Sequence, residues 1–134
     1  MASTRAALVA IIATTLAVAA CRTAPIRNVT NTPLNAAPRE SLTMDEVAKA
    51  IWRGGQEQGW QISEVRPGEL VGTLKLRSHV AVVTITHDTS RFSITYRDST
   101  NLLQSEGEIH KRYNTWVRNL EAAIQRELAT ASAR

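Results

Sequence analysis

The stretch "LVGTLKLRSHVAVVTITHDTSRFSITYR", residues 70–97, decides the fold because it holds three strand-like runs joined by very short polar turns. Its last run alternates, with Phe92, Ile94 and Tyr96 on one side and polar residues on the other. The run over residues 80–86 is rich in β-branched residues, which favour strands. Turns this short cannot hold a parallel crossover, so the strands are expected to form an antiparallel meander.

A fourth strand and a helix are expected before this stretch. The run "WQISEV", residues 60–65, ends at a Pro-Gly turn and supplies the strand. The helix is expected from Thr43 to about Gln58, because Thr43 and Glu46 have the spacing of a capping box. The pair Gly54-Gly55 either ends this helix or lets another backbone approach it.

A second helix is expected after the meander, with Ser105 as its N-cap and Glu108 three residues later. Its apolar residues form one stripe: Ile109, Tyr113, Trp116, Val117, Leu120, Ile124 and Leu128. The fold class is therefore predicted as α+β, in the order helix, four-stranded antiparallel meander, helix. Both helices should cover one face of the sheet in a two-layer globular domain over residues 41–130.

The N-terminus has the features of a signal peptide over residues 1–20: an early Arg5, an uncharged apolar run, and small residues before Cys21. "VAAC", residues 18–21, resembles the bacterial lipobox. The resemblance implies that the chain is cleaved before Cys21 and that this residue is lipidated, with acyl chains such as palmitate. The alternative is an ordinary secretory peptide with an accidental cysteine. Arg22, where an aspartate would favour inner-membrane retention, implies a lipid anchor in the bacterial outer membrane and a domain facing the periplasm, or else the cell surface.

Residues 22–40 hold Pro25, Pro33 and Pro38 and show no helical period. Together with Cys21 they are expected to form a flexible tether over residues 21–40. In the alternative, "PIRNVT", residues 25–30, adds a short edge strand to the domain.

The segment "IHKRYNTWVRNL", residues 109–120, resembles a signature of small proteobacterial outer-membrane lipoproteins of uncharacterised function. The resemblance extends over about residues 41–129 and includes Gly59-Trp60 and strands similar to "RSHVAVVTI" and "FSITYRDSTNL". It implies a small lipid-anchored α+β domain and no particular activity.

Composition and motifs argue against several classes of function. There are 16 Lys+Arg against 12 Asp+Glu without a cationic tract, so no nucleic acid is expected. His79 and His87 would lie roughly 26 Å apart on one strand, and no His or Cys has the spacing of a zinc site, so neither a metal nor another cofactor is expected. The sequence has no nucleophile elbow or phosphate loop, so it predicts a protein that is not an enzyme.

Two candidate sites remain. The uncovered sheet face should present Lys75, Arg77, Val82, Arg91 and Arg97 to an anionic or amphipathic partner, such as an envelope protein or peptidoglycan. In the alternative, its Val and Thr residues only favour strand formation and its charges only keep the face solvated.

Asn101, Tyr113 and Asn114 form a second, polar candidate, either a ligand site or a hydrogen-bonded joint between loop and helix. The sequence thus predicts a lipid-anchored, non-catalytic envelope lipoprotein that acts as an interaction or accessory module. The alternative is a periplasmic domain that binds a small ligand or peptidoglycan.

Overall fold

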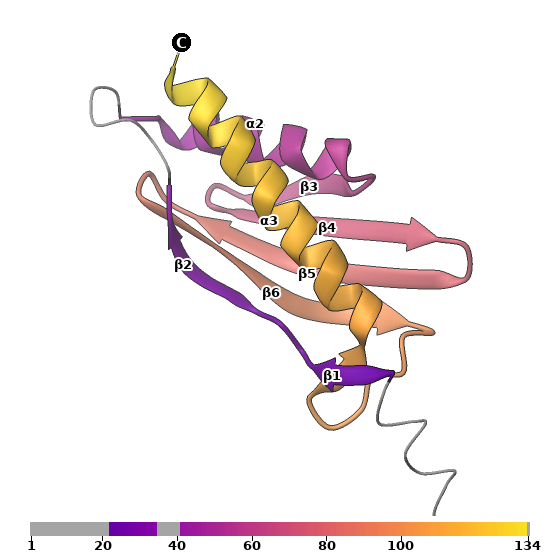
Figure 1. Ribbon diagram of the computed structural model, residues 1–134. Helices are drawn as coiled ribbons and strands as arrows, with labels where there is room; N and C mark the ends of the chain where they lie inside the picture. The colour runs from indigo at the N-terminus through magenta and orange to yellow at the C-terminus, as the bar shows by residue number, and fades with distance from the viewer. Residues whose placement is uncertain (1–21, 35–40, 134) are drawn as a thin grey trace, which may run out of the picture.

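The computed structural model describes residues 22–34 and 41–133. Figure 1 shows an antiparallel sheet with helices across one of its faces and a small second sheet at one end. The five-stranded sheet has the order β2-β6-β5-β4-β3, and the two-stranded sheet joins β1 to β7. The elements are β1 (Thr23–Pro25), β2 (Val29–Pro33), α2 (Met44–Glu57), β3 (Gln61–Arg66), β4 (Glu69–Leu76), β5 (His79–His87), β6 (Arg91–Thr100), β7 (Glu108–His110) and α3 (Lys111–Ser132).

The predicted α+β class is confirmed, and the four expected strands follow one another as β3 to β6. Their registers place Leu70 opposite Ile85 and Ile85 opposite Ile94, so apolar side chains line up on the helix side. Alternate residues of β4, β5 and β6 are buried there: Leu70, Gly72, Leu74, Ala81, Val83, Ile85, Phe92 and Ile94. This burial of apolar side chains is the main source of stability in such a fold.

The predicted four-stranded sheet is wrong in one respect, because β2 joins it as a fifth strand. Val29 pairs with Ile94 and is only 4% exposed, while Thr23 of β1 pairs with His110 of β7. Residues 22–34 are therefore part of the domain and not a tether. The alternative of an edge strand holds, although the strand runs over Val29–Pro33 and not over residues 25–30. Pro25 and Pro33 end their strands, where the missing N–H does not interrupt a ladder. The rest of the expected tether, residues 35–40, lies outside the described residues, as do the signal peptide and Cys21.

The first helix begins as predicted. Thr43 Oγ1 accepts a hydrogen bond from Glu46 N at 3.2 Å, and Glu46 Oε2 accepts one from Thr43 N at 2.8 Å. The glycine pair does not end the helix, which continues to Glu57. Instead, Gly54 lets α3 come close: a Cβ at this position would lie 2.8 Å from Ile124 N.

The second helix begins later than predicted, so the expected cap at Ser105 and Glu108 is wrong. The backbones of these two residues exchange hydrogen bonds of 3.0 and 2.9 Å across a two-residue turn. Glu106 and Gly107 form that turn with φ values of +50° and +80°, as a type I′ hairpin requires. His110 caps α3, because its Nδ1 accepts a hydrogen bond from Arg112 N at 3.1 Å.

The apolar stripe of α3 lies over the sheet as expected. Tyr113, Val117, Leu120, Ile124 and Leu128 are each fully buried. Within the described residues, neither helix combines the length and the apolar character needed to span a bilayer.

Candidate functional site

The open sheet face is the surface of β4, β5 and β6 that points away from the helices. The strand registers place three rows across it: Val71–Thr84–Thr95, Thr73–Val82–Asp98 and Lys75–Val80–Thr100. A fourth row, Glu69–Thr86–Ser93, lies toward the β5–β6 turn. None of these twelve residues is buried, whereas the alternating residues on the helix side are. The hydroxyl and methyl groups at its centre make this face weakly polar. Within the described residues, both helices lie on the other face of the sheet.

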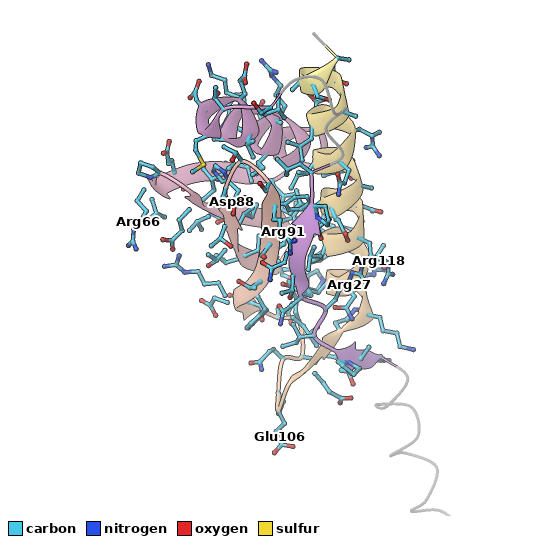
Figure 2. The ribbon with its side chains drawn as sticks, turned by 90° about the vertical axis from the view of Figure 1, so that its left-hand side faces the viewer. Arg27, Arg66, Asp88, Arg91, Glu106 and Arg118 are labelled. Carbon is cyan, nitrogen blue, oxygen red and sulfur yellow. The ribbon has the colours of Figure 1, made fainter. Side chains whose placement is uncertain are left out.

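Lys75 and Val82 lie where the alternation predicted them. Lys75 is exposed on β4, and Val82 is half-buried in the middle of β5. Arg91 is exposed at the start of β6, where its N–H donates to Asp88 Oδ1 at 2.8 Å. Figure 2 shows Arg91 and Asp88 close together beside this turn.

The other two predicted cations are not simple members of this face. β4 ends at Leu76, so Arg77 lies in the β4–β5 turn, with a φ of +56°. Arg97 is the extra residue of a bulge in β6, because Tyr96 pairs with Val83 and Asp98 pairs with Val82. The bulge brings the carboxylate of Asp98 into the open sheet face, which the regular alternation of the sequence did not predict.

The four predicted cations have no carboxylate partner among the described residues. The ion pairs found there join other residues: Arg27 to Glu121, Lys49 to Asp45, Arg66 to Glu69 and Arg126 to Glu57. Lys75, Arg77, Arg91 and Arg97 are all exposed. The charges of Lys75, Arg77 and Arg97 can therefore attract an anionic group, subject to screening by salt. The pKa of Asp88 is already lowered by backbone hydrogen bonds and, to a smaller extent, by the Arg91 charge.

Asn101 and Asn114 make separate local contacts rather than one polar patch. The Nδ2 of Asn101 donates to Ser78 Oγ at 2.8 Å, which joins the loop after β6 to the β4–β5 turn. Asn114 Oδ1 accepts from Arg27 N at 2.9 Å, and its Nδ2 donates to Pro25 O at 2.9 Å. Asn114 is thus a hydrogen-bonded joint, but it holds the N-terminal segment and not the loop.

Tyr113 belongs to the core. Its ring packs edge-on against Tyr96, with ring centroids 5.7 Å apart. Burial, and to a smaller extent the neighbouring Tyr96, raises the pKa of the Tyr113 hydroxyl well above its ordinary value. That hydroxyl has no hydrogen-bond partner within residues 22–34 and 41–133. It stays protonated near neutral pH and is not placed to contact a ligand.

His87, which was not predicted as a site residue, lies between two small hollows of about 170 and 230 Å³ at the end of β5. Burial lowers its pKa, although Asp88 and Glu64 act in the opposite direction. Its buried Nδ1 has no hydrogen-bond partner in the described part of the chain. Both hollows are smaller than the roughly 300 Å³ at which small-molecule pockets usually begin.

The described residues contain no group of three or more His, Cys, Asp or Glu side chains that could hold a metal ion. No family model, curated protein or solved structure matches this chain. The fold and its surface define the class in structural terms: a two-layer α+β domain with one open, hydroxyl-rich sheet face.

Proposed function

We propose that this protein is a lipid-anchored, non-catalytic lipoprotein of the bacterial outer membrane. Its domain faces the periplasm and acts as an interaction module for another envelope component. The anchor is proposed on the signal-peptide features of residues 1–20 and on the lipobox resemblance of residues 18–21. Acylation by two or three chains would give stable attachment, because a single chain binds a membrane only marginally.

The observation that carries the interaction role is the open sheet face. Its twelve residues are all at least partly accessible, although the sheet behind them is fully packed against the helices. A broad sheet face fits an extended partner surface better than it fits a small molecule, which usually needs a concave pocket. The face offers threonine hydroxyls and valine methyl groups at its centre and unpaired cations at its margin.

The charges at the margin favour an anionic partner. Lys75 on the face and Arg91 and Arg97 beside it form no salt bridge among the described residues, whereas Glu69 pairs with Arg66 at 3.2 Å, which leaves Asp98 and Asp88 as the nearby carboxylates. An acidic envelope protein and the peptide carboxylates of peptidoglycan both match this chemistry. Complementary charge mainly raises the rate and specificity of association.

Photo-crosslinking in living bacteria tests the proposed interaction. A crosslinking residue is placed at Val82 or Thr84 on the open sheet face, and at Arg53 on α2 as a control. We expect a discrete protein or glycan adduct from the open face and none from Arg53. Equal adduct patterns from all three positions, or none from the open face, would contradict the proposal.

Charge reversal supplies a second, matched test. The combined change Lys75→Glu, Arg91→Glu and Arg97→Glu should remove the adduct at Thr84 without unfolding the domain, because all three side chains are exposed. Reversal of Arg53 alone should leave the adduct unchanged. An adduct that survives the triple change would show that these cations do not recognise the partner.

The anchor is tested separately by membrane fractionation and intact-mass analysis. The natural chain should stay with the membrane and carry acyl chains, and Cys21→Ala should release it. A natural chain without added acyl mass would contradict the anchor and leave the interaction test standing.

A further inference from the structure

The chain beside Cys21 is fixed to the domain from its first described residue. The carbonyl oxygen of Arg22 accepts a hydrogen bond from Lys111 N at 3.0 Å, at the beginning of α3. Thr23 then pairs with His110, and Ile26 N donates to Gly107 O at 2.9 Å. Because one extended residue spans only about 3.3–3.6 Å, an acylated Cys21 would be joined to α3 without a spacer.

Several other segments meet at this end of the molecule, which we call the anchor end. It consists of Arg22, the turn 76–79, the loop 101–103, the hairpin 105–108 and residues 111–112. Hydrogen bonds join its parts: Asn101 Nδ2 to Ser78 Oγ at 2.8 Å, Asn101 O to His79 Nδ1 at 2.7 Å, and His110 N to Leu102 O at 2.8 Å. Figure 1 shows β1 and the start of α3 together, at the opposite end of the molecule from the C-terminus.

The anchor end has an excess of exposed positive charge. Its cations are Arg22, Arg77, Lys111 and Arg112, and none of them forms a salt bridge within the described residues. Its carboxylates are Glu106 and Glu108, and Figure 2 shows Glu106 at the tip of the hairpin. Burial lowers the pKa of His110, and the positive charges of Arg112, His79 and Arg22 lower it further. The hydrogen bond from Lys111 N to Arg22 O and the pairing of Thr23 with His110 hold Arg22 beside the basic start of α3.

The anchor end also exposes apolar side chains. Leu103 is 54% exposed and Leu76 is 44% exposed, and they are two of the five large hydrophobic residues left exposed in the described chain. Leu103 has a φ of +55°, a conformation that costs free energy for a leucine. Exposed leucines among basic residues are typical of surfaces that lie in the interface of a membrane.

We infer that the anchor end rests directly on a phospholipid surface, with Leu103 and Leu76 in the interfacial layer and Arg22, Lys111 and Arg112 among anionic headgroups. The inference rests on the proposed anchor at Cys21. Each basic residue near such a surface adds to the attraction, and the attraction falls off within a Debye length. The connection between lipid and domain is too short to hold these cations beyond that distance.

Site-specific quenching tests the inference on the acylated full-length protein. Because the chain has one cysteine, Cys21, an introduced thiol is the only reactive one after acylation. A fluorophore is attached through Leu103→Cys or, as a control, through Thr89→Cys. Position 89 lies beyond the far end of β5, whose ends at His79 and His87 are roughly 26 Å apart. The vesicles contain phosphatidylethanolamine, phosphatidylglycerol and a lipid with a nitroxide on its headgroup.

We expect quenching at position 103 to be about twofold or more that at position 89, because only the former would lie within the interfacial layer. Equal quenching at both positions on protein that sediments with the vesicles would overturn the inference and leave the anchor intact. Protein that stays in the supernatant would overturn the anchor and this inference together.

Charge reversal tests the role of the headgroups. The combined change Lys111→Glu and Arg112→Glu should reduce the difference in quenching between positions 103 and 89. The control pair Arg53→Glu and Arg118→Glu removes the same charge from other parts of the helices and should leave the difference unchanged. An undiminished difference after reversal at 111 and 112 would overturn the contact with anionic lipid.

Discussion

Gly54 and Gly55 are adjacent in α2, yet their surroundings differ. A Cβ on Gly54 would lie 2.8 Å from Ile124 N and 2.9 Å from the carbonyl carbon of Ala123, both backbone atoms of α3. A Cβ on Gly55 would meet side-chain atoms alone, those of Ile62 at 2.5 and 2.6 Å and Trp60 Cβ at 3.7 Å. The backbone of a packed helix is much harder to displace than one side chain on an edge strand.

We therefore expect Gly54→Ala to lower the free energy of unfolding by about 1–3 kcal/mol, the usual range for overpacking. Gly55→Ala should cost less, because Ile62 can rotate and alanine stabilises a helix by about 0.5–1 kcal/mol relative to glycine. Urea denaturation of the two variants measures the difference. Equal losses would show that the approach of α3 at Gly54 is not what limits the packing.

His87 makes the stability depend on pH in a definite direction. Its pKa in the folded protein is lowered, mainly by burial, whereas the unfolded chain keeps the ordinary value of 6.5. The unfolded state therefore binds more protons between these two values, so the stabilisation present above pH 6.5 is lost as the pH falls through that value. Burial also lowers the pKa of His110, which acts in the same direction.

We expect the urea concentration at the midpoint of unfolding to decrease as the pH is lowered from about 7.5 to about 5.5. Histidine is the side chain that normally titrates in this interval. His87→Gln should make this dependence weaker, with the remaining slope due to His110 and other groups. The pKa of Asp88 is lowered from 3.8, so this carboxylate contributes below that interval. The same pH dependence in His87→Gln and in the natural protein would contradict the assignment.

Among the elements, the hairpin before α3 has a first turn residue that fits its geometry poorly. Glu106 and Gly107 both have positive φ, and a type I′ turn favours asparagine at the first of these positions. Glu106→Asn should raise the free energy of unfolding by about 0.5 kcal/mol or more, as other improved turn residues do. Thermal unfolding measures the gain, and Glu106→Gln is the control because it removes the charge without favouring positive φ. A gain as large in Glu106→Gln would assign the effect to charge.

Local patterns predicted the elements that local forces determine. The capping box at Thr43 and the alternation of Phe92 and Ile94 depend on neighbours within a few residues, and both were confirmed. β2 was not the favoured prediction, because its single buried residue, Val29, gives no period and its partner strand is about 60 residues away. β7 has only three residues, and the spacing of Ser105, Glu108 and Ile109 predicts the start of a helix there.

The candidate site was predicted in part for the same reason. Alternation placed Lys75 and Val82 on the open sheet face, but no signal in the sequence marked the bulge that displaces Arg97 and brings in Asp98. Asn101 and Asn114 were grouped because they are polar and near each other in the chain. Their actual partners, Ser78 and residues 25–27, are distant in sequence and could not be found from spacing.

For the whole molecule, the main unpredicted feature is the closure of the domain by its own N-terminal segment. Asn114, which is 8% exposed, holds this segment through Pro25 O and Arg27 N. Asn114→Ala should lower the free energy of unfolding by about 1–2 kcal/mol, because two partly buried backbone groups lose their partner. Arg27→Ala removes only the exposed ion pair with Glu121 and should cost about 0–1 kcal/mol.

Hydrogen exchange distinguishes docking of this segment from general loss of stability. In Asn114→Ala the amide of Arg27 should exchange faster, even under conditions where the amides of α2 stay protected. In Arg27→Ala the amide at position 27 should stay protected. Unchanged exchange at Arg27 in the Asn114 variant would show that the segment is held by other contacts.

β1 and β2 pair with strands near the C-terminal end of the domain, and this pairing determines the order in which parts of the domain fold. Arg27 and Asn114 are 87 positions apart, and β1 pairs with β7 directly before the final helix. Contacts this distant in sequence form slowly, because the chain between them has to be closed into a loop first. Synthesis delivers the chain from its N-terminus, so residues 22–34 wait without partners until nearly all of the domain has been made. Residues 22–34, the part of the domain next to Cys21, are thus synthesised first and reach their folded pairing last.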